Sequence, residues 1–196
     1  MKWRILGPVE VTVGDVVLPI HRPQERALLA YLLLNADHVV STGRLIDALW
    51  GESPPQTART IVQTYVSHLR RALRDAGAGD ALVSQAGGYR LIAAEGEIDR
   101  AVFADHVRRA RAALAGGEPA EAARLLRAGL ALWRGTPLGG AAAEFVEDAA
   151  AGLTEQRLAA YEQLAEAELA VGQHEPLVAQ LRPLVAAHPL RERLVA

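Results

Sequence analysis

Apolar side chains in the first 20 residues come in short runs such as "WRIL", "VEVTV" and "VVLPI", with "GPV" and "VGDV" between them. Val/Ile-rich runs bounded by turn residues predict a small antiparallel sheet. The spacing of the apolar residues changes after Pro23 from short runs to a helical period. Leu28, Leu29, Leu32 and Leu33 then fall on one broad helical face. Proline suits the first turn of a helix, so a helix is expected to start there.

The next stretch predicts a compact series of short elements. "HVV" favours a strand, and "STGRLIDALWG" favours a helix with Ser41 or Thr42 as N-cap and Gly51 as its stop. A further helix should begin between Ser53 and Thr57 and end at "DAGAGD", and "ALVSQAGGYRLIA" predicts two strands around a glycine turn. This order of elements is that of a winged helix-turn-helix preceded by an N-terminal sheet.

Strand signals stop after residue 96, and helices are expected from there on. Asp99 can cap a helix that runs to about Gly116, a second helix opens at Glu118-Pro119 and ends near Gly135, and further helices span about 142–171 and start near 175. "GEPAEAARLLRAGLAL" and "GQHEPLVAQLRPLVAA" are loosely alike, which suggests helical hairpins of the tetratricopeptide kind, although 55 residues separate them.

The predicted fold class is therefore α+β, with a winged helix-turn-helix in residues 1–96 and an all-α, tetratricopeptide-like domain in residues 97–196. The chain stops in mid-pattern at "HPLRERLVA", and helical arrays need a capping end. We therefore expect the native protein to continue beyond residue 196.

The segment 58–75 separates into two faces at helical spacing. Ile61 or Val62, Val66, Leu69 and Leu73 form the expected buried stripe, with Tyr65 at its margin. Four arginines and no carboxylate occur between residues 57 and 74, whereas surface helices usually mix both signs of charge. The missing negative charge favours an anionic partner outside the chain.

A helix fits the major groove of DNA, where Gln can pair with adenine, Arg with guanine, and the Thr methyl group can touch thymine. Arginines can also meet phosphates, and the hairpin after the helix can reach the adjacent backbone or minor groove. The alternatives are a solvated cationic helix face and an ordinary edge hairpin. The candidate DNA-contacting residues are Arg59, Thr60, Gln63, Thr64, Ser67, His68, Arg70, Arg71, Arg74, Gln85 and Arg90.

Composition and motifs bear on the other possible functions of the chain, such as metal binding and catalysis. The formal net charge of the chain is −2, with ten basic and nine acidic residues up to residue 96, so the sum alone does not indicate a nucleic-acid binder. The sequence holds no cysteine, no apolar run of membrane-spanning length and no signal-peptide core, which makes the cytoplasm the expected compartment. The six histidines lack metal-ligand spacing and no nucleophile elbow occurs, so neither a metal, a cofactor nor an enzymatic activity is expected.

Two stretches in the right order resemble a known family. "RALLAYLLLNADHVVSTGRLIDALWGESPPQTARTIVQTYVSHLRRAL" followed by "GGYRL" is similar to the OmpR-type winged helix of Streptomyces antibiotic regulatory proteins. "EIDRAVFADHVRRARAAL", "LALWRGTPLGG" and "GQHEPLVAQLRPLVAAHPLRERL" resemble the bacterial transcriptional activator domain that follows it in that family.

The resemblance implies a transcriptional activator, often of antibiotic gene clusters, that binds tandem direct repeats of double-stranded DNA as side-by-side copies and recruits RNA polymerase. It places the polymerase contact in the loop before the recognition helix, at Glu52, Ser53, Pro54, Pro55 and Gln56. Trp50 is more readily explained as core packing. The alternative function is a helical protein-interaction scaffold whose winged helix no longer binds DNA.

Overall fold

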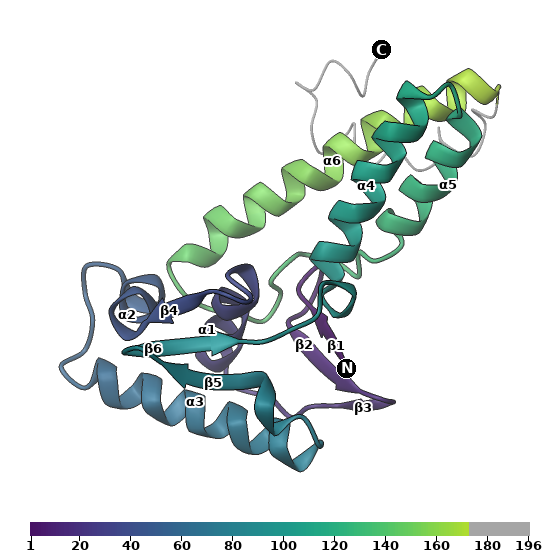
Figure 1. Ribbon diagram of the computed structural model, residues 1–196. Helices are drawn as coiled ribbons and strands as arrows, with labels where there is room; N and C mark the ends of the chain where they lie inside the picture. Colours follow the sequence, from purple (N-terminus) through teal and green to yellow (C-terminus); the bar gives the residue numbers. More distant parts are fainter. Residues whose placement is uncertain (173–196) are drawn as a thin grey trace. The chain divides into compact units, whose positions relative to one another are not determined.

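The computed structural model describes residues 1–172 (Figure 1). Contacts between residues divide the chain into two compact units. Unit 1 comprises Met1–Ala101 and Arg134–Ala151, and unit 2 comprises Val102–Trp133 and the chain from Gly152 onward. The two units interleave along the sequence, and the domain boundary after residue 96 stays a prediction.

The predicted N-terminal sheet is present in unit 1. Strands β1 (Lys2–Arg4), β2 (Glu10–Val13) and β3 (Val16–Val17) form an antiparallel sheet in the order β1-β2-β3. Trp3 is paired with Val11 and both are buried, so one face of this sheet joins the core. The short apolar runs of the sequence thus form strands that are half-buried, as their alternation indicates.

Three helices follow the pattern of the sequence closely. Helix α1 spans Pro23–Leu34, α2 spans Thr42–Trp50 and α3 spans Ala58–Asp75. The Ser41 hydroxyl accepts a hydrogen bond from the Arg44 amide at 3.2 Å, which caps α2, and Gly51 ends α2 with a φ of 54°. Helix α3 starts one residue later than expected, because the Ala58 amide still donates to the carbonyl of Pro55 in the preceding turn.

A second sheet holds the hairpin. Strands β4 (Val39–Ser41), β5 (Leu82–Gln85) and β6 (Gly88–Leu91) are antiparallel in the order β4-β6-β5, and short 3-10 turns lie at Gly79–Ala81 and Glu95–Glu97. Pairing of Gln85 with Gly88 leaves a two-residue turn, Ala86 and Gly87, which both have positive φ. The predicted hairpin is confirmed, and its turn is the tight kind that matches strand twist.

The stretch 134–144, here called the return segment, packs against the N-terminal sheet although it lies more than 120 residues downstream. The amide of Leu138 donates to the Ile5 carbonyl at 2.9 Å, and the Val9 amide donates to the Gly139 carbonyl at 3.0 Å. Further on, the Ala142 amide donates to the carbonyl of Pro23 at 3.2 Å. The return segment therefore connects the sheet to the start of α1 through backbone hydrogen bonds.

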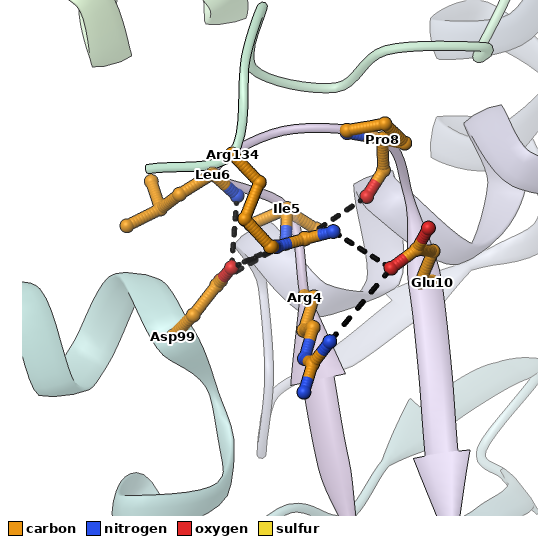
Figure 2. A network of polar contacts seen from close by, with 7 residues as sticks. All are labelled: Arg4, Ile5, Leu6, Pro8, Glu10, Asp99 and Arg134. Carbon is orange, nitrogen blue, oxygen red and sulfur yellow. Dashed lines mark hydrogen bonds and ion pairs between the residues drawn. The ribbon is translucent and has the colours of Figure 1, made fainter. Parts of the chain in front are cut away.

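A buried carboxylate lies at the centre of this packing (Figure 2). The Asp99 side chain is 8% exposed and accepts hydrogen bonds from the amides of Ile5 and Leu6 at 2.9–3.0 Å. The Arg134 guanidinium lies 3.6 Å from the same carboxylate, and it also donates to Glu10 at 2.7 Å. The sequence predicts Asp99 at the start of a helix. It does not predict that the Asp99 carboxylate binds the amides of Ile5 and Leu6, because more than 90 residues separate them.

Unit 2 is helical. Its helices are α4 (Asp99–Ala115), α5 (Pro119–Leu130) and α6 (Phe145–Val171). Helix α4 belongs to unit 2 from Val102 onward and α6 from Gly152 onward, whereas the first turns of both helices belong to unit 1. Phe103 and Trp133 meet edge to face at 5.3 Å in its core. The α+β fold class is confirmed, with sheets and helices first and helices afterwards.

Helix boundaries in unit 2 differ from the predicted ones. Helix α5 ends at Leu130, five residues before the predicted Gly135, because Ala131 and Leu132 form a turn that buries Trp133. The helix expected near residue 175 lies outside the described residues. Among the described helices, none combines the length and apolar character needed to cross a membrane.

We expect Asp99→Asn to change how stability depends on pH. Burial raises the pKa of Asp99, and the amides of Ile5 and Leu6 together with Arg134 only partly oppose that rise. A raised pKa means that folding favours the protonated form, so this contribution to stability is complete at low pH and is lost as pH rises through the folded-state pKa. Urea unfolding of wild type and variant across this range should show the wild-type advantage shrinking from pH 3.8 upward. An advantage that grows with pH would contradict this prediction.

Phe145→Ala should destabilise unit 1. The Phe145 ring, at the start of α6, meets the Tyr31 ring of α1 edge to face, with 5.0 Å between the ring centres. Such a pair contributes about 0.5–1.5 kcal/mol beyond its buried area. Thermal unfolding should show the loss, whereas Val171→Ala in unit 2, at an exposed apolar position, should leave the unfolding of unit 1 unaltered.

Candidate nucleic-acid interface

Helix α3 carries an exposed polar stripe opposite its buried one. Val62, Val66, Leu69 and Leu73 are buried, as predicted, and Val62 rather than Ile61 belongs to the core. At about 100° per residue, six exposed side chains fall within one face on the other side. They are Thr60, Gln63, Thr64, Ser67, Arg71 and Arg74. We call this set the polar stripe.

The polar stripe has the chemistry that base edges require. The Thr64 hydroxyl donates to the carbonyl of Thr60 at 2.9 Å, so its hydrogen is used inside the helix and its methyl group and lone pairs remain outward. Within residues 1–172, no acidic side chain forms an ion pair with Arg71 or Arg74. Small polar groups and unpaired guanidinium groups thus share one face.

Arg70 flanks the polar stripe on the hairpin side and is held there by the protein itself. Its Nε donates to the Leu82 carbonyl at 2.9 Å and its terminal nitrogen donates to the Ser84 hydroxyl at 2.9 Å. The guanidinium also lies over the Tyr89 ring, 5.7 Å from its centre. The side chain predicted to meet phosphate therefore fastens β5 to α3, and its role in DNA binding stays a prediction.

On the opposite flank, α3 is tied to α1. The Tyr65 hydroxyl donates to the Gln24 side chain at 2.6 Å, and His68 Nδ1 lies 2.8 Å from a carboxylate oxygen of Glu25. Burial, followed by the negative charge of Glu25, raises the pKa of Tyr65. The sequence indicated His68 as a DNA contact but gave no sign of its partner, because α1 and α3 are separate segments.

The hairpin tip is fixed against the start of α2. The Gly87 carbonyl accepts from the Thr42 amide at 3.3 Å and from the Thr42 hydroxyl at 3.2 Å. At Gly88 an added Cβ would lie 2.1 Å from the Val40 carbonyl oxygen, so only glycine fits there. Gln85 is exposed beside this turn, whereas Arg90 lies one strand inward, 3.7 Å from Asp37. Of the two predicted hairpin contacts, only Gln85 lies beside the tip.

The loop between α2 and α3 presents the five predicted polymerase-contact residues, all of them exposed: Glu52, Ser53, Pro54, Pro55 and Gln56. Trp50 just before them is half-buried. Gly51 begins the loop, and the Glu144 carboxylate of the return segment lies so close that a Cβ at residue 51 would overlap it. The position of Glu144 beside this loop has no local signal in the sequence, because 93 residues separate Glu144 from Gly51.

In the part of the chain that the structure describes, no group of three or more His, Asp or Glu side chains could hold a metal ion. The strongest candidate site of residues 1–172 is therefore the polar stripe with its two flanks.

The neighbouring arginines 70 and 71 make a matched test of this arrangement. Arg70→Gln should lower the free energy of unfolding by about 1–2 kcal/mol, because it removes hydrogen bonds from a charged donor to β5. Arg71→Gln, at an exposed position without an ion pair in residues 1–172, should change stability by less than about 0.5 kcal/mol. Urea unfolding of both variants measures this difference, and equal losses would show that Arg70 does not hold the hairpin.

Comparisons with known proteins identify the family of both parts of the chain. A family model described as "Bacterial transcriptional activator domain" matches residues 98–196, and one described as "Transcriptional regulatory protein, C terminal" matches residues 20–91. Regulatory protein AfsR of Streptomyces griseus is 38% identical over 194 residues, which cover 99% of this chain and 20% of the relative. Transcriptional regulatory protein MoaR1 of Mycobacterium tuberculosis is 40% identical over 200 residues, covering 99% of this chain and 64% of the relative.

A solved structure shares the fold. Mycobacterium tuberculosis EmbR, in complex with a low-affinity phosphopeptide, matches with a TM-score of 0.92 and 36% identity over 98% of this chain and 52% of that one. The chain thus spans less than two thirds of the length of these relatives. With an OmpR-type DNA-binding region followed by a bacterial transcriptional activator domain, the chain belongs to the Streptomyces antibiotic regulatory protein family of transcriptional regulators.

Proposed function

We propose that this protein is a sequence-specific, DNA-binding transcriptional activator without enzymatic activity. The observation that carries the proposal is the polar stripe of α3, which is exposed and holds two guanidinium groups without acidic partners in residues 1–172. A helix of this kind fits the major groove, where base edges carry a distinct pattern of donors and acceptors.

The side chains divide into base-reading and phosphate-binding groups. Gln63 and Arg71 have the bidentate geometry that adenine and guanine require, and Thr60, Thr64 and Ser67 let the helix backbone approach the bases. Arg59 and Arg74 are exposed near the two ends of α3, where phosphates border the groove. Arg70 holds the hairpin beside α3 through its hydrogen bonds to Leu82 and Ser84, and its own contact with phosphate stays a prediction.

We further propose that two copies bind side by side on direct repeats in promoters and that the loop of residues 52–56 meets RNA polymerase. The exposure of all five loop residues supports this contact. Antibiotic biosynthesis is the proposed target of regulation, on the strength of the family and of relatives such as AfsR of Streptomyces coelicolor, which is 42% identical over 195 residues.

A helical scaffold that binds other proteins is the second candidate. The observation in its favour is the charge of residues 1–96, where ten basic and nine acidic residues leave a sum of only +1. A phosphate binder must lose affinity steeply as salt rises, because each neutralised phosphate releases counterions. A titration of random duplex DNA against salt therefore separates the two candidates.

Arg71→Ala tests the base-reading role. If Arg71 pairs with guanine, the variant should lose about 1–3 kcal/mol of binding to the preferred site and relax sequence preference at one position. If it contacts only phosphate, all sequences should weaken alike and the salt slope should fall by about one. Footprinting on promoter DNA, followed by affinity measurements on the protected site, gives both quantities; absence of protection at low salt by folded protein would favour the scaffold.

A further inference from the structure

The ring of His68 contacts the buried carboxylate of Glu25. The Glu25 side chain, in the first turn of α1, is 8% exposed, and its carboxylate oxygen lies 2.8 Å from His68 Nδ1. An ionised carboxylate only accepts hydrogen bonds, so Nδ1 must carry the hydrogen. This fixes the orientation of the ring and leaves Nε2 as the atom that can meet a partner. Within residues 1–172, Nε2 has no hydrogen-bond partner.

The ring borders a hollow on the flank of the recognition helix. This hollow has a volume of about 280 Å³ and lies between the start of α1 and the second half of α3. Its titratable and charged side chains are His21, Arg22, Glu25, His68, Arg71 and Asp75. Four of these six can carry positive charge, and the carboxylate of Glu25 is already occupied by His68 and by Arg22 at 3.8 Å.

The hollow lies on the side of α3 that would face the DNA backbone if α3 entered the major groove. His68 is offset by about 90° from the centre of the polar stripe, on the side opposite to Arg70. A helix in the major groove has a phosphate wall on each side, so the side that carries Arg70 and the side that carries His68 would each face one backbone. Arg71 belongs both to the polar stripe and to the lining of the hollow, which joins the two surfaces.

We propose that the hollow holds a DNA backbone phosphate and that His68 binds it as the imidazolium, so that DNA binding takes up one proton. This inference rests on the proposed DNA binding and adds its regulation by pH. A neutral ring with its hydrogen on Nδ1 offers phosphate only a lone pair, whereas the imidazolium donates from Nε2 while Nδ1 still donates to Glu25.

The charged side chains around His68 are of both signs, so a bound DNA phosphate is the additional negative charge that favours the imidazolium. Glu25 and Asp75 favour the imidazolium, while Arg22, Arg71 and a charged His21 oppose it. The Tyr65 hydroxyl, which donates to Gln24 next to Glu25, is neutral in this range and adds no charge. A phosphate in the hollow supplies the further negative charge, and histidine is the side chain that titrates between pH 5 and 8.

The test measures affinity for the footprinted duplex from pH 6 to pH 8 at constant ionic strength. Wild type should bind about threefold to tenfold more tightly at pH 6 than at pH 8, because the protonated ring adds a charge-assisted hydrogen bond to the phosphate. His68→Gln keeps a donor but cannot titrate, so its affinity should be independent of pH. Arg71→Gln should bind more weakly at every pH but retain the slope.

Control variants identify the titrating group. His21→Gln in the hollow and His38→Gln, an exposed side chain whose ring nitrogen lies 3.0 Å from the Ala36 carbonyl, should keep the wild-type slope. Glu25→Gln should move the gain in affinity to lower pH, because the anion that supports the imidazolium is gone. A flat wild-type profile, or an unchanged slope in His68→Gln, overturns the proposal.

Two further measurements distinguish proton uptake from DNA binding in general, and a DNA phosphate from free phosphate. Steep salt dependence at pH 7.5 without any pH dependence would leave DNA binding intact and remove only the proton uptake. Nuclear magnetic resonance of the His68 ring should show the imidazolium on addition of duplex and little change with inorganic phosphate alone. An equal response to free phosphate would overturn the assignment to the DNA backbone. Urea unfolding confirms that each variant is folded.

Discussion

Burying the carboxylate of Asp99 requires hydrogen-bond donors, because an unpartnered charge inside a protein costs more free energy than the surrounding apolar packing can offset. The donors come from the amides of Ile5 and Leu6, with the guanidinium of Arg134 at 3.6 Å (Figure 2). Three distant parts of the chain must therefore be present together: the end of β1, the start of α4 and the return segment. These contacts tie the start of the chain to residues from about 94 to 129 positions downstream within unit 1.

Local patterns in the sequence were sufficient for most elements of unit 1. The four leucines after Pro23, the Ser41 cap and the stripe from Val62 to Leu73 are signals carried by residues within a few positions of each other. The exposed members of α3 follow from the same periodicity, so the polar stripe was also predictable. The end of α5 was not, because the burial of Trp133 against Phe103 depends on contacts between helices.

What the sequence could not indicate is which basic side chains are already occupied. Arg70 and Arg71 are adjacent and chemically identical, yet the first binds β5 and the second has no ion pair within residues 1–172. Likewise His68 faces Glu25, and the Glu144 carboxylate lies beside Gly51. Each of these pairings joins residues between 12 and 93 positions apart, so a count of charges along one helix overestimates the groups free to meet an anion.

The interleaving of the units has a consequence for synthesis on the ribosome. A nascent chain that has emerged only to residue 96 contains both sheets and α1 to α3 but not Asp99, Arg134 or Leu138, whose side chain or backbone amides bond to Ile5 and Leu6. Translation proceeds at about 5–20 residues per second, so the missing stretch up to Ala151 arrives only after several seconds. During that interval the side chains of Trp3 in β1 and of Ile5 just after it, which are fully buried in the folded chain, lack the residues that pack against them from beyond residue 96. The rate of translation between residues 97 and 151 thus sets how long these apolar side chains wait for the segment that buries them.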